Sequence, residues 1–185
     1  FGNGAQFLMV LIITAIASLV LGLGLPTTAN YIVMATLTAP VIYRLGESFG
    51  YGMPLVAAHL FVFFFGILAD DTPPVGLAAY AAAAIARSDP IKTGIQGFTY
   101  DMRTAILPFM FIFNTKLLLI GVNGWFEGIW IFLSAVLGML AFAAGTQGYM
   151  LVRTNIVERL LLLTVAFMLI QPTLVTDIVG LGLVL

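Results

Sequence analysis

The sequence has 185 residues, of which 62% are hydrophobic and only 8% are charged, with a net charge of −1. A soluble domain usually carries about 25% charged residues, so this composition indicates an integral membrane protein. The small net charge argues against nucleic acid as a partner, and the absence of cysteine excludes disulfides and thiolate metal sites.

Apolar segments recur along the chain, and a helix that crosses a membrane needs about 20 such residues. We therefore predict an all-α polytopic membrane protein with about six to eight helical segments. The predicted helices and a final apolar tail are Ala5–Leu23, Thr28–Tyr43, Met53–Ala69, Leu77–Arg87, Tyr100–Ile120, Ile129–Ala144, Leu160–Ile170 and Val175–Leu185. The predicted turns and loops are residues 44–52, 88–97, 121–128, 145–149 and 153–159.

A polar break, "DDTPPVG", interrupts the apolar sequence after Ala69. The segment from Pro74 to Arg87 would form a helix of only about 21 Å, shorter than the roughly 30 Å needed to cross the hydrocarbon core. Because Pro73 and Pro74 remove two amide donors, we predict one membrane helix broken in the middle. Thr72 is expected to cap the second half, with proline in its first turn.

A break at membrane depth is tolerated only where it is buried in protein or lines a water-filled cavity. Carbonyl groups at the end of the first half-helix suit a cation, and amides at the start of the second half suit an anion. The break also contains two carboxylates, Asp70 and Asp71. An acid at membrane depth is costly and usually has a function, so these carboxylates favour a cation site.

An earlier break, within "GLGLPTTAN", has the same chemical character. Its residues are Gly22, Gly24, Pro26, Thr27, Thr28 and Asn30. The glycines loosen the first helix, the proline stops it, and a threonine can cap the next one. Two such breaks close together would form a small polar site of the kind that secondary transporters have near the membrane midplane. Each break can also be an ordinary turn between spanning helices, although the shortness of Pro74–Arg87 counts against this at the second break. The first break can also be a helical hairpin.

The remaining polar residues have simpler interpretations. His59 lies alone in a helix and is interpreted as a packed, hydrogen-bonded residue. Asp101 and Arg103 are assigned to a solvated or locally paired face. The sequence contains no P-loop, no Ser–His–Asp set and no metal-ligand spacing, so neither an enzymatic activity nor a cofactor is expected.

Long motifs around both breaks resemble a known transporter family. They are "GLGLPTTANYIVMATLTAPVIYRLG" and "AAHLFVFFFGILADDTPPVGLAAYAAAAIARSDPIKTG", and the similarity continues through Ile106–Asn114 and Glu158–Leu183. The sequence resembles the large membrane subunit of tripartite ATP-independent periplasmic (TRAP) transporters, and is most similar to the fused permeases of the TAXI subclass. The resemblance covers nearly the whole chain.

This resemblance implies a secondary transporter of the bacterial or archaeal inner membrane, with an elevator-like mechanism. Such a permease imports an organic acid that an extracytoplasmic solute-binding protein delivers, and sodium is the usual coupling ion. The chain would be the C-terminal half of the large subunit, with residues 1–121 as half of the transport domain and 122–185 as C-terminal transmembrane helices. We expect it to be a piece of a longer polypeptide, completed by the other half and by a small-subunit region.

The resemblance also implies roles for the residues of the breaks at 22–30 and 69–76. The expected ion-binding residues are Gly24, Asp70, Asp71 and Thr72. The expected substrate-binding residues are Pro26, Thr27, Thr28, Asn30, Pro73, Pro74 and Gly76. The family often has an apolar residue at the position of Asp71, so this carboxylate either faces solvent or marks a variation in the ion site.

Two other interpretations remain open. In a non-transporting helical membrane scaffold, the two breaks would be ordinary turns between helices. A proton-coupled carboxylate carrier of related fold would depend on pH rather than on sodium.

Overall fold

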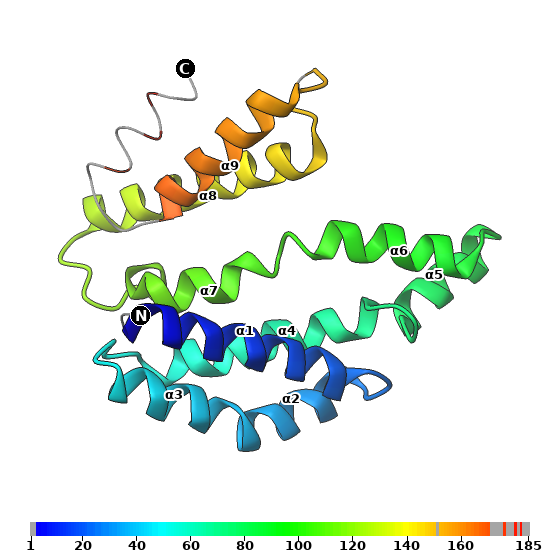
Figure 1. Cartoon of the computed structure of the whole chain (residues 1–185), viewed down its shortest axis with the longest axis horizontal. Helices are drawn as coiled ribbons and strands as arrows, with labels where there is room; N and C mark the ends of the chain where they lie inside the picture. Colours follow the sequence, from blue (N-terminus) through cyan, green and yellow to red (C-terminus); the bar gives the residue numbers. More distant parts are fainter. Residues whose placement is uncertain (1–2, 151, 171–175, 177–179, 181, 183–185) are drawn as a thin grey trace. The chain divides into compact units, whose positions relative to one another are not determined.

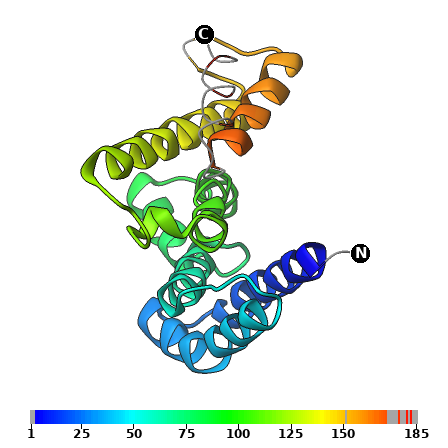
Figure 2. The ribbon, with the colours of Figure 1, turned by 90° about the vertical axis from the view of Figure 1, so that its left-hand side faces the viewer.

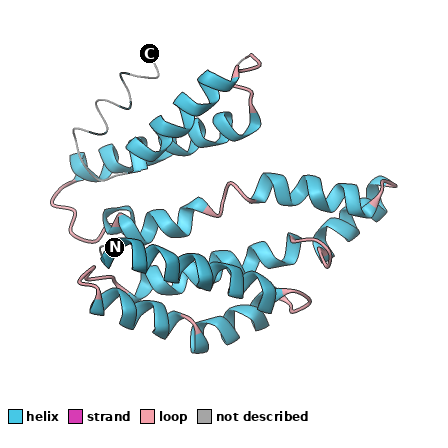
Figure 3. Cartoon of the chain, viewed as in Figure 1, coloured by secondary structure: helices cyan, strands magenta, loops and turns pink. Residues whose placement is uncertain are grey.

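The computed structural model describes residues 3–150, 152–170, 176, 180 and 182. The described residues form helices joined by loops, without a strand (Figure 3), which confirms the all-α prediction. Most of the predicted tail, 175–185, lies outside the described residues. The chain divides into two compact units, residues 1–112 and 113–185. Each unit is described separately below.

The first unit is an array of helices that run back and forth. They are α1 (Asn3–Gly22), α2 (Thr27–Leu37), α3 (Ala39–Ser48), α4 (Leu55–Asp71), α5 (Leu77–Ala86), α6 (Pro90–Asp101) and α7 (Ile106–Phe113). The chain runs out along α1, returns along α2 and α3, runs out again along α4 and α5, and returns along α6 and α7 (Figure 1, Figure 2).

Helix α4 is the centre of this unit, because it contacts α1, α2, α3, α5 and α6. Its sequence is apolar around most of its circumference, as expected for a helix surrounded by others. The rings of Phe61 and Phe65 pack edge-on against Phe109 of α7, with centroid distances of 5.2 and 5.9 Å. Such aromatic pairs contribute about 0.5–1.5 kcal/mol beyond their buried area.

One predicted helix, Thr28–Tyr43, is two helices that meet at Thr38. Pro40 explains the division, because it lacks the amide that would continue the hydrogen-bond ladder and its ring clashes with the carbonyl four residues earlier. The hydroxyl of Thr38 donates to the Met34 carbonyl at 2.9 Å and satisfies one acceptor at the end of α2. The predicted turn at 44–52 is also too long, since α3 continues to Ser48.

The prediction of a loop at 88–97 is wrong, because most of this segment belongs to α6. The Asp89 carboxylate accepts a hydrogen bond from the Lys92 amide at 2.9 Å, and Pro90 occupies the first helical turn. Both residue types are preferred at these positions, so the Asp-Pro pair was an available signal for a helix start.

The predicted helix Tyr100–Ile120 is also interrupted. Helix α6 ends at Asp101 and α7 begins at Ile106. Pro108 cannot donate an amide to the Thr104 carbonyl, which favours a break at this point. The Thr104 hydroxyl donates to the Asp101 carbonyl at 2.6 Å and closes the end of α6.

The second unit contains a 3-10 turn, η1 (Thr115–Leu118), and two helices, α8 (Trp125–Gln147) and α9 (Ile156–Ile170), which pack along each other. The prediction of a loop at 153–159 is wrong beyond Asn155. The Asn155 side chain accepts from the Ile156 amide at 2.6 Å, and Glu158 accepts from the Asn155 amide at 2.8 Å. This reciprocal capping starts α9 earlier than its apolar run suggests.

Among the described residues, two helices are long and apolar enough to cross a membrane, Gly4–Gly22 and Trp125–Gln147. Within the second unit, small residues allow α8 and α9 to approach closely. A Cβ added at Gly145 would lie 3.2 Å from the Arg159 carbonyl oxygen. The Ser134 hydroxyl donates to the Leu169 carbonyl at 2.9 Å. Both features are typical of helix packing in membranes.

Candidate functional site at the two helix breaks

The first break is a helical hairpin. Helix α1 ends at Gly22, the backbone turns through Gly24 with a φ of +83°, and α2 begins at Thr27 (Figure 1). A positive φ is readily adopted only by glycine, so Gly24 permits the reversal. The prediction that Thr27 or Thr28 caps α2 is wrong, because Pro26 occupies the cap position without a side-chain hydrogen bond.

The second break is a broken helix, as predicted from the two prolines. Helix α4 ends at Asp71, and α5 continues outward from Leu77 (Figure 1). Thr72 is not the cap of α5, since its hydroxyl donates backward to the Leu68 carbonyl at 2.7 Å. Gly76 precedes α5, and the prolines lie in the turn rather than in the first helical turn.

The two breaks meet in space at the side chain of Asn30. Its amide nitrogen Nδ2 donates to the Gly66 carbonyl of α4 at 3.1 Å, and none of Asn30 is exposed. Gly22, the last residue of α1, lies at the same place, because an added Cβ would be 2.4 Å from the Cβ of Ala69. The ends of α1 and α4 and the start of α2 therefore converge, which the sequence predicted only as a possibility.

The predicted site residues differ in their exposure to solvent around this junction. Asn30 and Gly76 are buried. Asp70, Asp71, Thr72 and Pro73 are partly buried, whereas Gly24, Pro26, Thr27, Thr28 and Pro74 are exposed. The exposed residues include the first turn of α2, whose leading amides have no partner within the helix. The partly buried residues carry carboxylates, carbonyls and a hydroxyl, which are the groups that hard cations prefer.

Asp101 is a site candidate that the sequence interpretation missed. Its carboxyl group lies close enough to that of Asp71 for the two to interact, because α6 packs against α4. Asp101 therefore joins the second break instead of a solvated face. No local pattern connects residues so far apart in the sequence. Among the described residues, no acidic, histidine or cysteine side chains form a group of three or more that could bind a metal ion.

His59 connects α4 to α2, as a packed and hydrogen-bonded residue should. Its Nδ1 lies 3.2 Å from the hydroxyl of Tyr31, which follows Asn30 in α2. The Tyr31 ring also packs edge-on against Phe63 at 5.5 Å. The prediction that His59 is packed and hydrogen-bonded is confirmed.

A small cavity of about 140 Å³ lies between the second break and α6. It is lined by Pro73, Pro74, Gly76, Tyr80, Pro90, Ile91, Gly94 and Ile95. Sites for small molecules usually have about 300 Å³ or more, so this cavity is too small to hold a solute by itself. The Tyr80 hydroxyl donates to the Pro74 carbonyl and attaches α5 to the turn.

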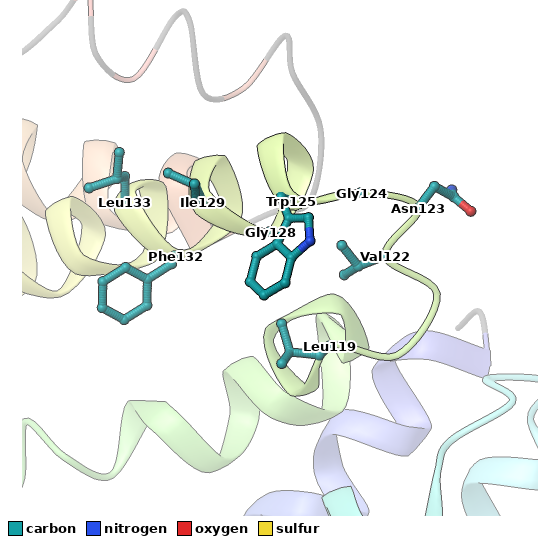
Figure 4. A pocket seen from close by; sticks show the side chains of 9 residues that line it. All are labelled: Leu119, Val122, Asn123, Gly124, Trp125, Gly128, Ile129, Phe132 and Leu133. Atoms are coloured by element: carbon teal, nitrogen blue, oxygen red, sulfur yellow. The ribbon is translucent and has the colours of Figure 1, made fainter.

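A larger groove of about 530 Å³ lies in the second unit, at the start of α8 (Figure 4). It is lined by Leu119, Val122, Asn123, Gly124, Trp125, Gly128, Ile129, Phe132 and Leu133. Figure 4 shows the Trp125 ring beside Leu119 and Val122. The lining contains no charged side chain, so it lacks the groups that would hold a carboxylate or an ion. The helix breaks remain the better candidate site.

Comparison with known protein families gives two matches. The family "Tripartite ATP-independent periplasmic transporter, DctM component" matches residues 1–126, which include both breaks. A "Domain of unknown function (DUF3394)" matches residues 128–180. No curated protein and no solved structure matches the chain.

Proposed function

Because the chain belongs to the DctM component family of tripartite ATP-independent periplasmic transporters, we propose that it imports an organic acid by coupling uptake to sodium. Family membership makes it part of the permease of a secondary transporter. We further propose that the permease is of the fused TAXI type and that this chain supplies the C-terminal half of its large membrane domain. Its proposed location is the inner membrane of a bacterium or archaeon.

The observation that carries the proposal is the meeting of the two breaks at Asn30 and Gly66. Half-helix ends that converge inside a helical unit place free carbonyls and free amides in one region, and transporters bind ions and carboxylates with such groups. We propose the carbonyls near Gly24 and Asp70, with the Thr72 hydroxyl, as sodium ligands. The amides that follow Thr28 and Pro74 would bind the solute carboxylate.

The proposed partners follow from the family. An extracytoplasmic solute-binding protein would deliver the organic acid, and the other half of the permease with a small membrane subunit region would complete the site. An elevator movement of the first unit would carry ion and solute across the membrane. No cofactor other than the coupling ion is required by this proposal.

The test is solute uptake by the full-length permease in proteoliposomes, with its binding protein, with and without an inward sodium gradient. Uptake should require both the gradient and the binding protein, and Asp70→Asn and Thr72→Ala should weaken sodium-driven uptake without reducing expression. Thr36→Ala is the matched control, since Thr36 is exposed on α2 and its hydroxyl bonds only within its own helix. Unchanged sodium dependence in both site variants would refute the ion-site assignment.

A proton-coupled carrier is the second candidate, and the neighbouring carboxyl groups of Asp71 and Asp101 favour it. A pair of close carboxyl groups can take up and release a proton during transport. This candidate predicts uptake that follows an inward proton gradient and continues without sodium. The same proteoliposomes, with the pH gradient replacing the sodium gradient, distinguish the two.

A further inference from the structure

We propose that Asn30 is a positioning residue, whose buried side chain fastens the α1–α2 hairpin to α4 so that both breaks move as one body. The effect on transport rests on the proposed function, whereas the contacts of Asn30 do not depend on it. It differs from the substrate-binding role that the family resemblance implies for Asn30.

The burial of Asn30 argues against direct contact with a solute. Its side chain is 0% exposed, and Nδ2 donates to Gly66 at 3.1 Å. The Gly66 carbonyl belongs to the hydrogen-bond ladder of α4, and its second lone pair is free for a side-chain donor. The Asn30 side chain therefore links the start of α2 to the hydrogen-bond ladder of α4.

Two glycines, Gly22 and Gly66, pack against the side chain of Asn30. A Cβ at Gly22 would lie 2.2 Å from Nδ2 of Asn30, a distance that atoms do not tolerate, and a Cβ at Gly66 would lie 3.4 Å from it. Helix α1 can end at this point only because Gly22 has no side chain. The contact at Asn30 therefore involves α1 as well as α2 and α4.

A second attachment between α2 and α4 starts from the next residue of α2 and reaches an earlier part of α4. It joins Tyr31 to His59 at 3.2 Å, and His59 precedes Gly66 by about 10 Å along the axis of α4. One attachment would leave α2 free to pivot about it. Two attachments that reach α4 about 10 Å apart resist this rotation, so the hairpin and α4 are held in one relative position.

The first experiment separates positioning from contact with the solute. Asn30→Leu keeps the approximate size and branching of the side chain and removes the Nδ2 donor without burying a charge. In the full-length permease, this variant should raise the sodium concentration for half-maximal uptake by about fivefold, the effect of losing one net hydrogen bond. The solute KM at saturating sodium should remain unchanged. A raised solute KM with unchanged sodium dependence would overturn the proposal, and so would unchanged constants with a lower yield of folded protein.

The second experiment tests the common movement. Tyr31→Cys and His59→Cys place two thiols on facing helices of a chain that has no other cysteine. In a permease without other cysteines, a short bifunctional cross-linker should leave uptake at the level of the untreated double variant. Loss of uptake on cross-linking would show that α2 and α4 move relative to each other, and would overturn the proposal.

Hydrogen exchange distinguishes failure of this inference from failure of the proposed function, because it needs no transport. In the full-length permease, Asn30→Leu should increase exchange at 22–30 and at 66–76 together, while Thr36→Ala should not. If the wild type shows no sodium-driven uptake but exchange increases in both breaks, the coupling proposal fails and the positioning role stands. Increased exchange in one break alone would overturn the positioning role.

Discussion

Asp71, at the end of α4, and Asp101, at the end of α6, have carboxyl groups close enough to interact. Each residue lies where a helix is interrupted, and both are partly buried. Because two neighbouring carboxylates repel each other, either a proton or a cation that binds beside them relieves the repulsion, and the two compete. The pair can therefore make ion binding sensitive to pH, whichever ion drives uptake.

Replacement of Asp101 tests this competition. Asp101→Asn removes one of the two neighbouring carboxyl groups, so the competition between proton and cation is reduced and the pH dependence of uptake should become weaker. The measurement is the initial uptake rate of the full-length permease across the pH range in which the wild type varies. Asp89→Asn is the control, since asparagine also caps helices and Asp89 is exposed at the start of α6. An unaltered pH profile in Asp101→Asn would contradict the role of the pair.

Gly22→Ala should destabilise the permease by about 1–3 kcal/mol, the usual cost of overpacking. Its added Cβ would overlap both Asn30 and Ala69. The additional change Ala69→Gly should recover part of the loss, because it removes one of the two overlaps. The midpoint of thermal unfolding of the full-length protein measures both effects.

Gly97→Ala is the matched control for that substitution. Gly97 lies inside α6, and no neighbouring atom is within 4 Å of its added Cβ. Alanine is favoured over glycine inside a helix by roughly 0.5–1 kcal/mol, so this variant should be neutral or more stable. Equal destabilisation at Gly22 and Gly97 would show that the contact at Gly22 is not restrictive.

Tyr80→Phe should loosen the second break without unfolding α5. It removes the hydroxyl that donates to the Pro74 carbonyl and keeps the ring. We expect faster hydrogen exchange at 72–77 and slower uptake, since the turn between the half-helices loses its attachment. Tyr43→Phe, in α3, is the control. Unchanged exchange in Tyr80→Phe would mean that the prolines alone hold the turn.

Arg159→Lys should release the end of α8. Arg159 of α9 donates from Nε to the Gly145 carbonyl at 3.0 Å and from Nη2 to the Thr146 carbonyl at 3.1 Å. Lysine has one nitrogen and cannot reproduce this two-point contact, so the loss should be about 1 kcal/mol. Faster hydrogen exchange near residue 147 is the expected result. Arg44→Lys, at an exposed position of α3, should not change the exchange there.

Local backbone chemistry made much of the fold predictable. Prolines and glycines act on their own segment, so the breaks at 22–30 and 69–76 lie where their composition places them. Pro40 and Pro108 accompany two further local interruptions, although both prolines lie within apolar runs that by themselves predict a continuous helix. The Asp89–Pro90 pair at the start of α6 is a local signal as well.

The sequence alone determined that this protein is helical, apolar enough for a membrane, and interrupted twice by polar residues. Only the tertiary structure decided that the breaks meet, that Asn30 bonds to Gly66, and that Asp101 joins Asp71. These contacts connect residues on different helices. They depend on how the chain reverses at Gly24 and continues at the second break, and no local pattern of side chains contains that information.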